Sequence, residues 1–585
     1  MKFSDFAGYF EKLEAISSRI ELTNILAGLF RNVSADEIDK VAYLLQGRVV
    51  PFFEPIEMGM ADRMVEQAIA SAYGVPKDEV RKLAVKTGDM GLVAERLSSN
   101  LNPPAGGQSS KLKIGEVYDS LYRIATTGGK GSVEKKISTL ADLLKNLDPK
   151  SAKHLLKITL AKLRLGIGDP TVLDALSVAK LGDKSARLSL EEAYNKTSDL
   201  GFVAKTFWSG GLKAVEKVEL QVGKPVRPAL AERLPNAQEV IKRVGTEFAA
   251  EPKYDGFRCQ IHLDKAKEVR IFSRNLEDFT HAFPDLVEAV KKEVKAESAI
   301  FEGEAIAFNP ITGEYYPFQE TTKRRRKYDI EEVAKKLPLK LFVFDLLYLN
   351  GKDLTGTAFK DRRNKLLTII SKDNKIVRLS EEYVLHSEKD IEDKFSEAVT
   401  SGLEGLMIKK LDSPYKAGAR GFHWIKFKRA ASGQLSDTID CVLLGIYTGT
   451  GKRTEFGAGG LLVGVYDTEK DEFVTVSRVG TGLTDEEWRK VYGISQRIQV
   501  DHKPARVNAL IEPSYWVEPK EVLEILADEI TRSPVHTAGK IGDNPGYALR
   551  FPRLISFRGT DKRAEDATTV KELISMYKQQ RKIKL

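Results

Sequence analysis

Lys253 is the residue of this chain whose neighbours could turn it into a nucleophile. Glu251 stands two residues before it, Asp255 and Gly256 follow closely, and Arg258 comes next. An unperturbed lysine amine has a pKa near ~10.4 and is protonated at neutral pH, so nucleophilic use requires burial or neighbouring cations that lower this pKa. Taken alone, a Lys-x-Asp-Gly pattern favours an exposed lysine paired with Asp255, because three fixed positions recur by chance. The rest of the chain must decide between these two hypotheses.

The residues after Lys253 alternate between apolar and polar side chains. The apolar members are Phe257, Cys259, Ile261 and Leu263, and between them stand Arg258, Gln260 and His262. Alternation with a period of two is typical of a half-buried β-strand. We therefore expect Lys253 to lie in a loop just ahead of a strand, with Asp255 and Gly256 forming the turn.

Carboxylates follow on a second expected strand. Residues 299–308 are strand-like and contain Glu302 and Glu304, which share one face because side chains two apart on a strand point the same way. Residues 340–348 form a continuous apolar run, closed by Asn350 and Gly351, which predicts a buried strand.

Further charged residues stand on two later segments, 402–409 and 423–428. In residues 402–409, strict alternation would place Glu404 and Lys409 on opposite faces; either the strand twists or ends there, or the two do not share a site. In residues 423–428, Trp424, Lys426 and Lys428 share one face of a strand whose other face is apolar. Such a strand would direct both lysines into one pocket.

The distribution of expected helices and strands along the chain predicts three domains. Residues 1–215 read as helical almost throughout, as in the i, i+3, i+4 spacing of apolar residues from Phe6 to Ile20, with a loop at 102–110. Residues 216–432 mix short strands with helices. Residues 433–585 hold many short strands and one helix (484–498), which fits a small barrel of the oligonucleotide-binding (OB) type.

Composition describes an ordinary globular chain with a modest basic excess. The 585 residues carry a net charge of +9, and 42% of them are hydrophobic. Basic residues cluster at 323–327 and near the C-terminus, where a solvated face and phosphate contact are equally good explanations. Two distant cysteines, Cys259 and Cys441, make a disulfide framework or a zinc site improbable. Without an apolar spanning run or a signal peptide, we expect an intracellular, cytoplasmic protein.

Five motifs stand in an order that resembles the covalent nucleotidyltransferases, the superfamily of DNA ligases, RNA ligases and mRNA capping enzymes. They occupy residues 253–258, 301–304, 342–345, 404–409 and 424–428. The helical first part resembles the DNA-binding domain of archaeal and eukaryotic replicative ATP-dependent DNA ligases, notably at 163–168. Residues 550–553 and 566–569 resemble the last motif of that family.

The resemblance implies an all-α DNA-binding domain, an α+β adenylation domain and a C-terminal OB-fold β-barrel. By resemblance, Lys253 attacks ATP and holds AMP, which then passes to the 5′-phosphate of a nick, where the 3′-hydroxyl displaces it. Glu304 and Glu404 would hold Mg²⁺, or Mn²⁺ in its place, with a ribose contact as the other role open to Glu304. Lys426 and Lys428 would bind the α-phosphate and lower the pKa of Lys253 by like-charge repulsion.

The remaining nucleotide contacts are also implied by the resemblance. Phe344 would stack on adenine and Glu251 would accept a hydrogen bond from its amino group. Arg258, Arg274 and Arg420 would contact the nucleotide or the 5′-phosphate. Arg550 and Arg553 would reach the ATP pyrophosphate when the C-terminal domain closes over the site.

Three alternatives share some of these features. An RNA ligase or another covalent nucleotidyltransferase would share the central motifs, but is not expected to carry the long helical domain. A non-catalytic DNA-binding scaffold is expected to have lost Lys253 or the metal carboxylates, which this chain retains. The expected partner is nicked double-stranded DNA, met in replication, repair and recombination by a monomer. Such ligases often bind a sliding clamp, although the sequence shows no convincing motif for one; in a prokaryote the protein would be associated with the nucleoid.

Overall fold

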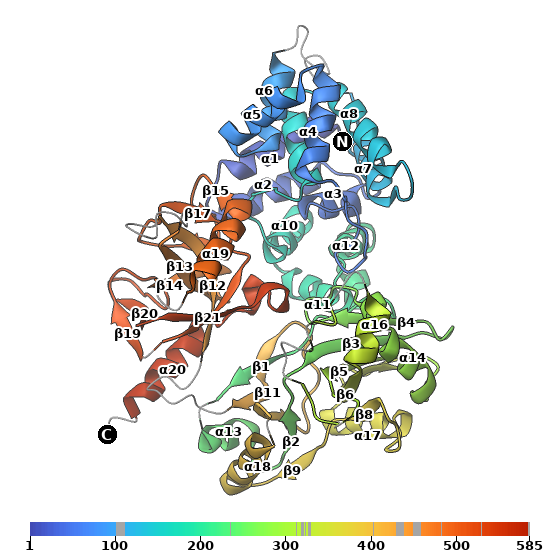
Figure 1. The fold of residues 1–585 in the computed structure, drawn as a ribbon, viewed down its shortest axis with the longest axis vertical. Coiled ribbons are helices and arrows are strands. Elements are labelled where there is room, and N and C mark those ends of the chain that lie inside the picture. Colours follow the sequence, from blue (N-terminus) through green and yellow to red (C-terminus); the bar gives the residue numbers. More distant parts are fainter. Residues whose placement is uncertain are drawn as a thin grey trace. The chain divides into compact units, whose positions relative to one another are not determined.

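The computed structural model describes residues 1–100, 111–234, 236–311, 313–316, 321, 323–325, 329–401, 403–428, 438–448, 458–480, 483–527 and 529–582. They form two compact units, the first made of Met1–Tyr194 and Ser198–Val218 and the second of Asn195–Thr197 and Glu219–Leu585. Figure 1 labels many of the helices and strands of each unit. The loop predicted at 102–110 and the domain boundary predicted at 433 lie outside the described residues.

Most of the described residues of the first unit lie in helices, as the sequence predicted. The helices are α1 (Phe3–Glu14), α2 (Arg19–Arg31), α3 (Ile38–Leu45), α4 (Asp62–Tyr73), α5 (Lys77–Thr87), α6 (Met90–Ser99), α7 (Ile114–Thr126), α8 (Ser132–Lys145), α9 (Pro149–Thr159), α10 (Asp169–Leu181), α11 (Arg187–Thr197) and α12 (Leu200–Glu216). Their buried residues recur at helical spacing, for example Phe3, Phe6, Phe10 and Leu13 on α1.

One predicted helix is divided in two. The apolar spacing from Phe6 to Ile20 suggested a single helix, but α1 ends at Glu14 and α2 starts at Arg19. Ser18 is the N-cap of α2, and its side chain accepts a hydrogen bond from the backbone N–H of Glu21. Ile20 consequently faces solvent and is 75% exposed. The N-cap at Ser18 therefore starts a new helix within a stretch whose apolar spacing suggested a single one.

The second unit begins with two sheets. The first has the order β4-β3-β5-β6-β7, with β8 beside β6, and the second has the order β1-β11-β10-β2-β9. The first sheet is built from β4 (Val269–Ser273), β3 (Phe257–Leu263), β5 (Ala299–Ala307), β6 (Leu339–Leu349), β7 (Lys352–Asp353) and β8 (Val377–Leu379). The second is built from β1 (Leu230–Arg233), β11 (Arg420–Lys428), β10 (Gly405–Lys410), β2 (Phe248–Lys253) and β9 (Tyr383–Leu385).

Helices and a shared core cover both faces of these sheets. The helices are α13 (Ala237–Val244), α14 (Pro284–Glu293), α16 (Ile330–Lys336), α17 (Phe359–Ile369) and α18 (Glu388–Thr400). Side chains of α14 and α17 join the core of the first sheet, and those of α13 and α18 join the core of the second. A smaller apolar cluster contains residues of both sheets, including Ile300, Leu347 and Trp424. The two sheets therefore pack against each other through this cluster.

Strand β3 is buried on both faces, although its alternating sequence predicted a half-buried strand. Its polar side chains are covered by residues that precede β1. Gln260 accepts a hydrogen bond from the Val226 N–H at 2.7 Å, and His262 accepts one from the Gly223 N–H at 2.9 Å. Buried polar side chains of this kind are tolerated because their hydrogen bonds are satisfied.

A third, curved sheet forms the C-terminal part of the second unit. Its order is β15-β17-β12-β13-β14-β16, and β18 joins β12 to β21. The strands are β12 (Ile439–Tyr447), β13 (Gly460–Asp467), β14 (Glu472–Val479), β15 (Gln499–Val500), β16 (Val507–Asn508), β17 (Tyr515–Val517), β18 (Val522–Leu526) and β21 (Arg553–Phe557). The irregular register of β12 between Leu443 and Gly445 lets it pair with β17 and β18 in turn. This curvature is that of the predicted OB-type barrel.

Two helices and a hairpin complete the C-terminal part. The hairpin is formed by β19 (Glu529–Ser533) and β20 (Gly546–Arg550), and the helices are α19 (Asp485–Ile498) and α20 (Val570–Lys582). Thr484 and Glu487 cap the start of α19 reciprocally, which explains why this helix was predictable from the sequence. Across the described part of the chain, no helix has the length and apolar character needed to cross a membrane.

Candidate active site

Lys253 is the last residue of β2, not part of a loop ahead of β3 as the sequence predicted. β2 is buried along all of its length except at Lys253, so its sequence does not alternate and gave no sign of a strand. The predicted connection at Asp255 and Gly256 is present, since residues 254–256 join β2 to β3. Because β2 and β3 belong to different sheets, Lys253 lies where the chain passes from one sheet to the other.

Strand register brings Lys253 into line with Lys428. β10 pairs Gly405 with Lys253 on one side and with Lys428 on the other. Glu404, just before β10, forms ion pairs with the ammonium groups of both lysines. Gly405 has φ 147°, and a Cβ atom there would lie 2.1 Å from the carbonyl oxygen of Phe427. Glycine is therefore required for the close approach that holds this row together.

The face of Glu404 and Lys409, which the sequence left open, is now defined. β10 begins at Gly405, so strand alternation does not apply to Glu404. The Nζ atom of Lys409 lies 2.6 Å from Oε2 of Glu251 and donates to the carbonyl oxygen of Phe344 at 2.9 Å. Glu404 and Lys409 both line one cavity.

That cavity, of about 270 Å³, collects almost all of the residues singled out in the sequence. Its lining includes Glu251, Lys253, Arg258, Arg274, Glu304, Phe344, Glu404, Arg420, Lys426 and Lys428. These residues come from strands of both sheets and from the segments between them. Two of the predicted contacts, Arg550 and Arg553, are not among its lining residues.

Burial is the main influence on the pKa values of Lys253 and Glu304. Burial lowers the pKa of Lys253 below its ordinary value; Glu304 and Asp255 oppose this shift, whereas Arg274 and Arg558 add to it. Burial likewise raises the pKa of Glu304 to about 7, against the opposing effect of Lys253. A lowered pKa favours nucleophilic use of the Lys253 amine, and the carboxylate of Glu304 offers oxygen atoms to a cation.

The two lysines of β11 share one face, as predicted, and both are perturbed. Burial is the main cause that lowers the pKa of Lys426 to about 7 and that of Lys428 to about 6. Repulsion from Lys253 adds to the shift of Lys428. The sequence predicts that these lysines lower the pKa of Lys253 by repulsion. The repulsion between Lys253 and Lys428 is present in the shift of Lys428, and the largest causes that lower the pKa of Lys253 are burial, Arg274 and Arg558.

Arg258 is held by a buried carboxylate that the sequence analysis did not assign. Its Nη2 donates to Oε2 of Glu302 at 2.8 Å, and its Nη1 donates to the carbonyl oxygen of Ala229 at 3.0 Å. The hydroxyl of Tyr415 also donates to Glu302, at 2.8 Å. The guanidinium lies 5.5 Å from the ring centre of Phe344. Arg258 is thereby fixed beside the aromatic ring of the site.

The C-terminal part of the unit supplies further charged groups to the cavity. Arg558 and Lys562 line it, and both pair with Asp440, the former at 3.0 Å. The two cations outweigh burial and hold the pKa of Asp440 well below its usual range. Arg420, a predicted phosphate contact, pairs with Glu572 at the start of α20.

Arg558 and Lys562 are cationic residues of the cavity to which the sequence analysis gave no role. Arg550 and Arg553, which are expected to reach the pyrophosphate when the C-terminal domain closes, do not line the cavity in this structure. Arg550 is 56% exposed and lies 3.7 Å from Glu529. Arg553 is exposed at the start of β21. The only available signal was the cluster Arg558, Asp561 and Lys562, which lies a few residues beyond the arginines that the resemblance favoured.

The basic clusters of the sequence have different environments. Arg324 is buried and pairs with Asp285 at 2.6 Å, so it supports the fold and does not face solvent. Arg325 lines the cavity and pairs with Asp561 at 2.7 Å. The last two residues of the 323–327 cluster lie outside the described part of the chain. At the C-terminus, Lys578 is exposed.

Unsatisfied polar atoms indicate what the cavity can bind. Among the described residues, Oε1 of Glu251, Nε of Arg258 and Nε of Arg274 are buried without a hydrogen-bond partner. All three residues line the cavity. One free acceptor and two free cationic donors fit a ligand with an amino group and anionic phosphates, such as ATP. The carboxylates of Glu304 and Glu404 supply the oxygen ligands that Mg²⁺ prefers.

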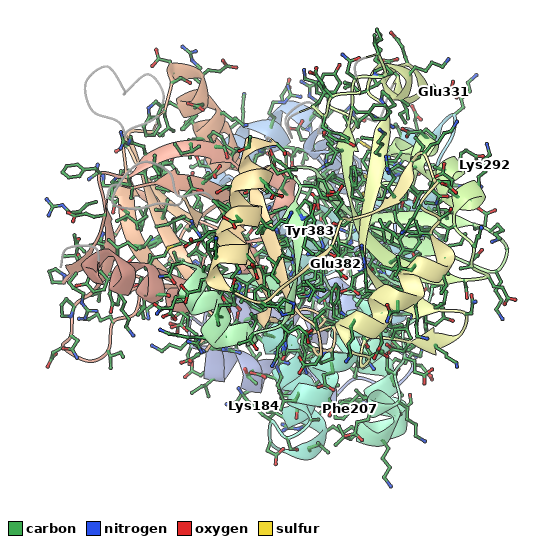
Figure 2. All side chains as sticks on the ribbon, turned by 90° about the horizontal axis from the view of Figure 1, so that it is seen from below. Lys184, Phe207, Lys292, Glu331, Glu382 and Tyr383 are labelled. Carbon is green, nitrogen blue, oxygen red and sulfur yellow. The ribbon has the colours of Figure 1, made fainter. Side chains whose placement is uncertain are left out.

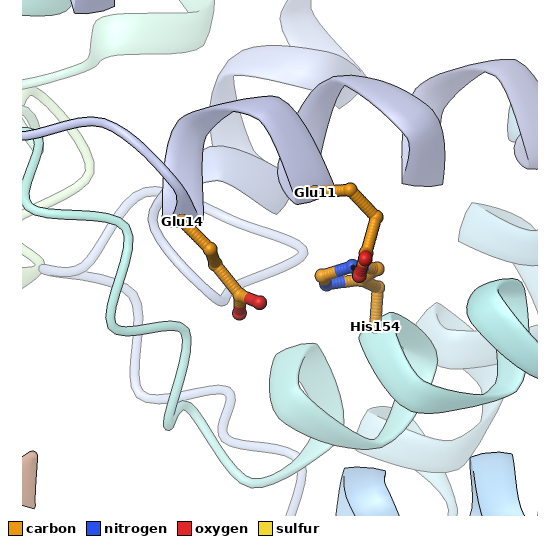
Figure 3. Close-up of side chains that lie close together, drawn as sticks. All are labelled: Glu11, Glu14 and His154. Atoms are coloured by element: carbon orange, nitrogen blue, oxygen red, sulfur yellow. Dashed lines mark hydrogen bonds and ion pairs between the residues drawn. The ribbon is translucent and has the colours of Figure 1, made fainter. Parts of the chain in front are cut away.

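A second cluster of possible metal ligands lies in the first unit. Glu11 and Glu14 of α1 point toward His154 of α9 (Figure 3). Lys153 binds both glutamates, at 2.5 and 2.9 Å, and Lys157 binds Glu14 at 2.5 Å. Because lysine ammonium groups already neutralise these carboxylates, the cluster is an ion-pair network that joins α1 to α9.

The fold and the cavity together define a class. A lysine at the end of a strand shares one cavity with two carboxylates and two further lysines, and an OB-type barrel follows in the chain. This is the arrangement that the resemblance to covalent nucleotidyltransferases implies.

Comparisons with known proteins identify the family within that class. Residues 2–177 match the model of the DNA ligase N terminus, 228–428 the ATP dependent DNA ligase domain, and 453–562 the ATP dependent DNA ligase C terminal region. The chain is 51% identical to "Probable DNA ligase" of Dictyoglomus turgidum, covering 100% of this chain and 99% of the relative. It is 42% identical to "DNA ligase 2" of Thermofilum pendens, covering 100% and 98%.

The chain belongs to the ATP-dependent DNA ligases. It is an enzyme that seals nicks in DNA through an adenylated intermediate and uses ATP and a divalent metal ion. Family members act in DNA replication and repair. The alternatives of an RNA ligase, another nucleotidyltransferase or a non-catalytic scaffold are therefore set aside.

Proposed function

We propose that Lys253 is the residue that receives AMP. Its Nζ would form a bond to the α-phosphorus of ATP while the bond from that phosphorus to the oxygen bridging the β-phosphate breaks and pyrophosphate leaves. The proton shed by the nitrogen can pass to Glu404, which already pairs with it. The observation that carries this proposal is the row of Lys253, Glu404 and Lys428 on the wall of the cavity.

The adenine base would be bound by Phe344 and Glu251. Phe344 offers an aromatic face on β6, and Glu251 offers the free acceptor oxygen for the amino group of adenine. The ring of Trp424 lies edge-on to Phe344, with 5.8 Å between centroids, and holds it in place.

The phosphates would be bound by the cationic groups of the cavity. Lys426 and Lys428 project from one face of β11 and suit the α-phosphate. Arg258, Arg274 and Arg420 would contact the nucleotide or the 5′-phosphate of the nick, because all three line the cavity and a guanidinium group can bind two phosphate oxygens at once.

For the pyrophosphate, we favour Arg558 and Lys562 over Arg550 and Arg553. The first two line the cavity, and their partner Asp440 orients them there. Fixed cations stabilise charge on a leaving phosphate because they need no reorganisation during the reaction.

Glu304 and Glu404 would hold the divalent metal ion, which offsets negative charge on the phosphates when bound. Both carboxylates line the cavity. In that role, the raised pKa of Glu304, about 7, makes metal binding compete with protonation below neutral pH.

We further propose that the substrate is nicked double-stranded DNA, bound by a monomer in the cytoplasm or on the nucleoid. Binding of a sliding clamp can be tested by mixing the purified proteins and measuring their joint elution in size-exclusion chromatography.

Intact mass spectrometry tests the proposal. Incubation with ATP and Mg²⁺ is expected to add one AMP, which pyrophosphate removes and which nicked DNA discharges with sealing. Lys253→Ala should show neither adduct nor sealing. If Lys253→Ala still gained AMP, another residue would be the nucleophile.

A further inference from the structure

Glu251 and Lys409 form a buried ion pair at the base-binding end of the cavity. Their side chains are 2% and 1% exposed, and Oε2 of Glu251 lies 2.6 Å from Nζ of Lys409. The other oxygen, Oε1, has no hydrogen-bond partner among the described residues. The pair therefore uses one carboxylate oxygen, while the other faces Arg363 at 3.7 Å and makes no hydrogen bond.

Lys409 is also held in place by the aromatic wall of the cavity. Its ammonium group donates to the carbonyl oxygen of Phe344 at 2.9 Å and lies 4.8 Å from the ring centre of Phe344. It lies 4.7 Å from the ring centre of Trp424. A cation in this position is fixed by hydrogen bonding and by cation–π contacts, and it cannot turn toward solvent.

The charge of Glu251 depends on few neighbours. The titratable groups facing it are Lys409 from β10, Arg363 from α17, Glu382 from the segment ahead of β9 (labelled in Figure 2) and Tyr254 from the connection after β2. Burial raises the pKa of Glu251, and Lys409 and Arg363 oppose that shift.

Arg363 alone would serve two carboxylates. It lies 3.7 Å from Glu251 and 3.5 Å from Glu382, and it also donates to the carbonyl oxygens of Val343 and Ser380. Removal of the Lys409 charge would therefore leave a single cation shared between the buried Glu251 and the partly exposed Glu382. Under those conditions a proton on Glu251 is favoured, because an uncompensated buried carboxylate is costly.

We propose that Lys409 is a specificity-determining residue that keeps Glu251 ionised, so that the enzyme accepts adenine and rejects 6-oxopurines. An ionised carboxylate can only accept hydrogen bonds, which suits the 6-amino group of adenine and repels the 6-oxo group of hypoxanthine. A protonated carboxyl could donate to that oxo group instead. This inference rests on the proposed function, in which Glu251 contacts the base.

The test compares the rates at which ATP and inosine triphosphate each form a covalent nucleotide adduct, measured by intact mass between pH 6 and pH 9. Lys409→Met should raise the inosine-to-adenosine rate ratio about tenfold or more, the discrimination of one buried hydrogen bond, and the ratio should rise further as pH falls. Lys409→Arg keeps the charge and should keep the wild-type ratio. The matched control is Lys410→Met, because Lys410 is 41% exposed and pairs loosely with Asp412 at 3.9 Å.

Glu251→Gln provides an independent variant. Its amide can donate and accept without a charge, so the ratio should rise and lose its pH dependence, even if Lys409→Met does not fold. A wild-type ratio at every pH in folded Lys409→Met, or a wild-type ratio in Glu251→Gln, would overturn the inference. Failure of the wild-type enzyme to form any adduct with ATP would instead overturn the proposed function.

Discussion

Gly405→Ala is expected to disable adduct formation while the domain still folds. The new Cβ would lie 2.1 Å from the carbonyl oxygen of Phe427, 3.0 Å from the Cα of Lys428 and 3.1 Å from the ring of Phe395. Since real Cβ contacts do not fall below 3.0 Å, β10 and β11 must separate by about 0.9 Å at this point. The backbone also has φ 147°, which an alanine adopts only with strain of about 1–3 kcal/mol.

The displacement falls on the row of side chains that surrounds Lys253. Gly405 follows Glu404 directly and pairs in register with both Lys253 and Lys428. A misplacement near 1 Å in a catalytic arrangement costs roughly 100-fold in rate. We therefore expect the rate of AMP transfer to the enzyme to fall by about two orders of magnitude, with a drop of several degrees in Tm.

Single-turnover adduct formation, followed by intact mass, measures the rate, and thermal unfolding monitored by circular dichroism measures the fold. The matched control is Gly356→Ala, because a Cβ at Gly356 meets no atom within 4 Å and its φ is ordinary. A Gly405→Ala enzyme that forms the adduct at the wild-type rate would refute the reasoning. So would a Gly356→Ala enzyme that loses activity to the same extent.

Four further results are expected. Arg558→Ala should slow adduct formation about 100-fold, as for other fixed cations that stabilise a leaving group, whereas Arg550→Ala should change it less than about threefold; rapid-quench kinetics compare the two. The adduct rate should rise with pH and level off below the ordinary lysine pKa of 10.5, because burial lowers the pKa of Lys253; a pH–rate profile checks this. EDTA should abolish adduct formation and Mg²⁺ or Mn²⁺ should restore it, as read by intact mass. A hydrogen bond from His154 is the main cause that lowers the pKa of Glu11 from 4.5 to about 2, so the stabilisation of the folded state by ionised Glu11 is present above pH 4.5 and is lost as pH falls toward 2. Glu11→Gln should therefore lower the free energy of unfolding by about 1–2 kcal/mol at pH 7, after allowance for solvent screening, and hardly change it near pH 2. Urea unfolding at the two pH values measures this difference.

The strands that could be predicted from the sequence are those with a clear pattern of apolar residues. The strand with Lys426 and Lys428 could be predicted because one of its faces is apolar, and the run at 340–348 because it is almost continuously apolar and most of it is buried. The meeting of the charged residues in one cavity could not come from periodicity, since it depends on the pairing of strands distant in sequence. It was expected only through the family resemblance.

The errors have equally specific causes. β2 was missed because a strand buried on both faces does not alternate, so Lys253 was placed in a loop. Arg558 and Lys562 were given no role because Arg558 and Arg550 stand in similar basic stretches, and only the fold shows which stretch lines the cavity. The role of Lys409 was left open because the start of β10 at Gly405 has no sequence signature.

The identity of the residue that carries AMP tests directly whether Lys253 is the nucleophile. After reaction with ATP and Mg²⁺, the enzyme would be digested under conditions that preserve phosphoramidates, and the modified peptide sequenced by tandem mass spectrometry. The account predicts AMP on Lys253 alone, in the peptide that joins β2 to β3. AMP on another residue, such as Lys426 or Lys428, would contradict it.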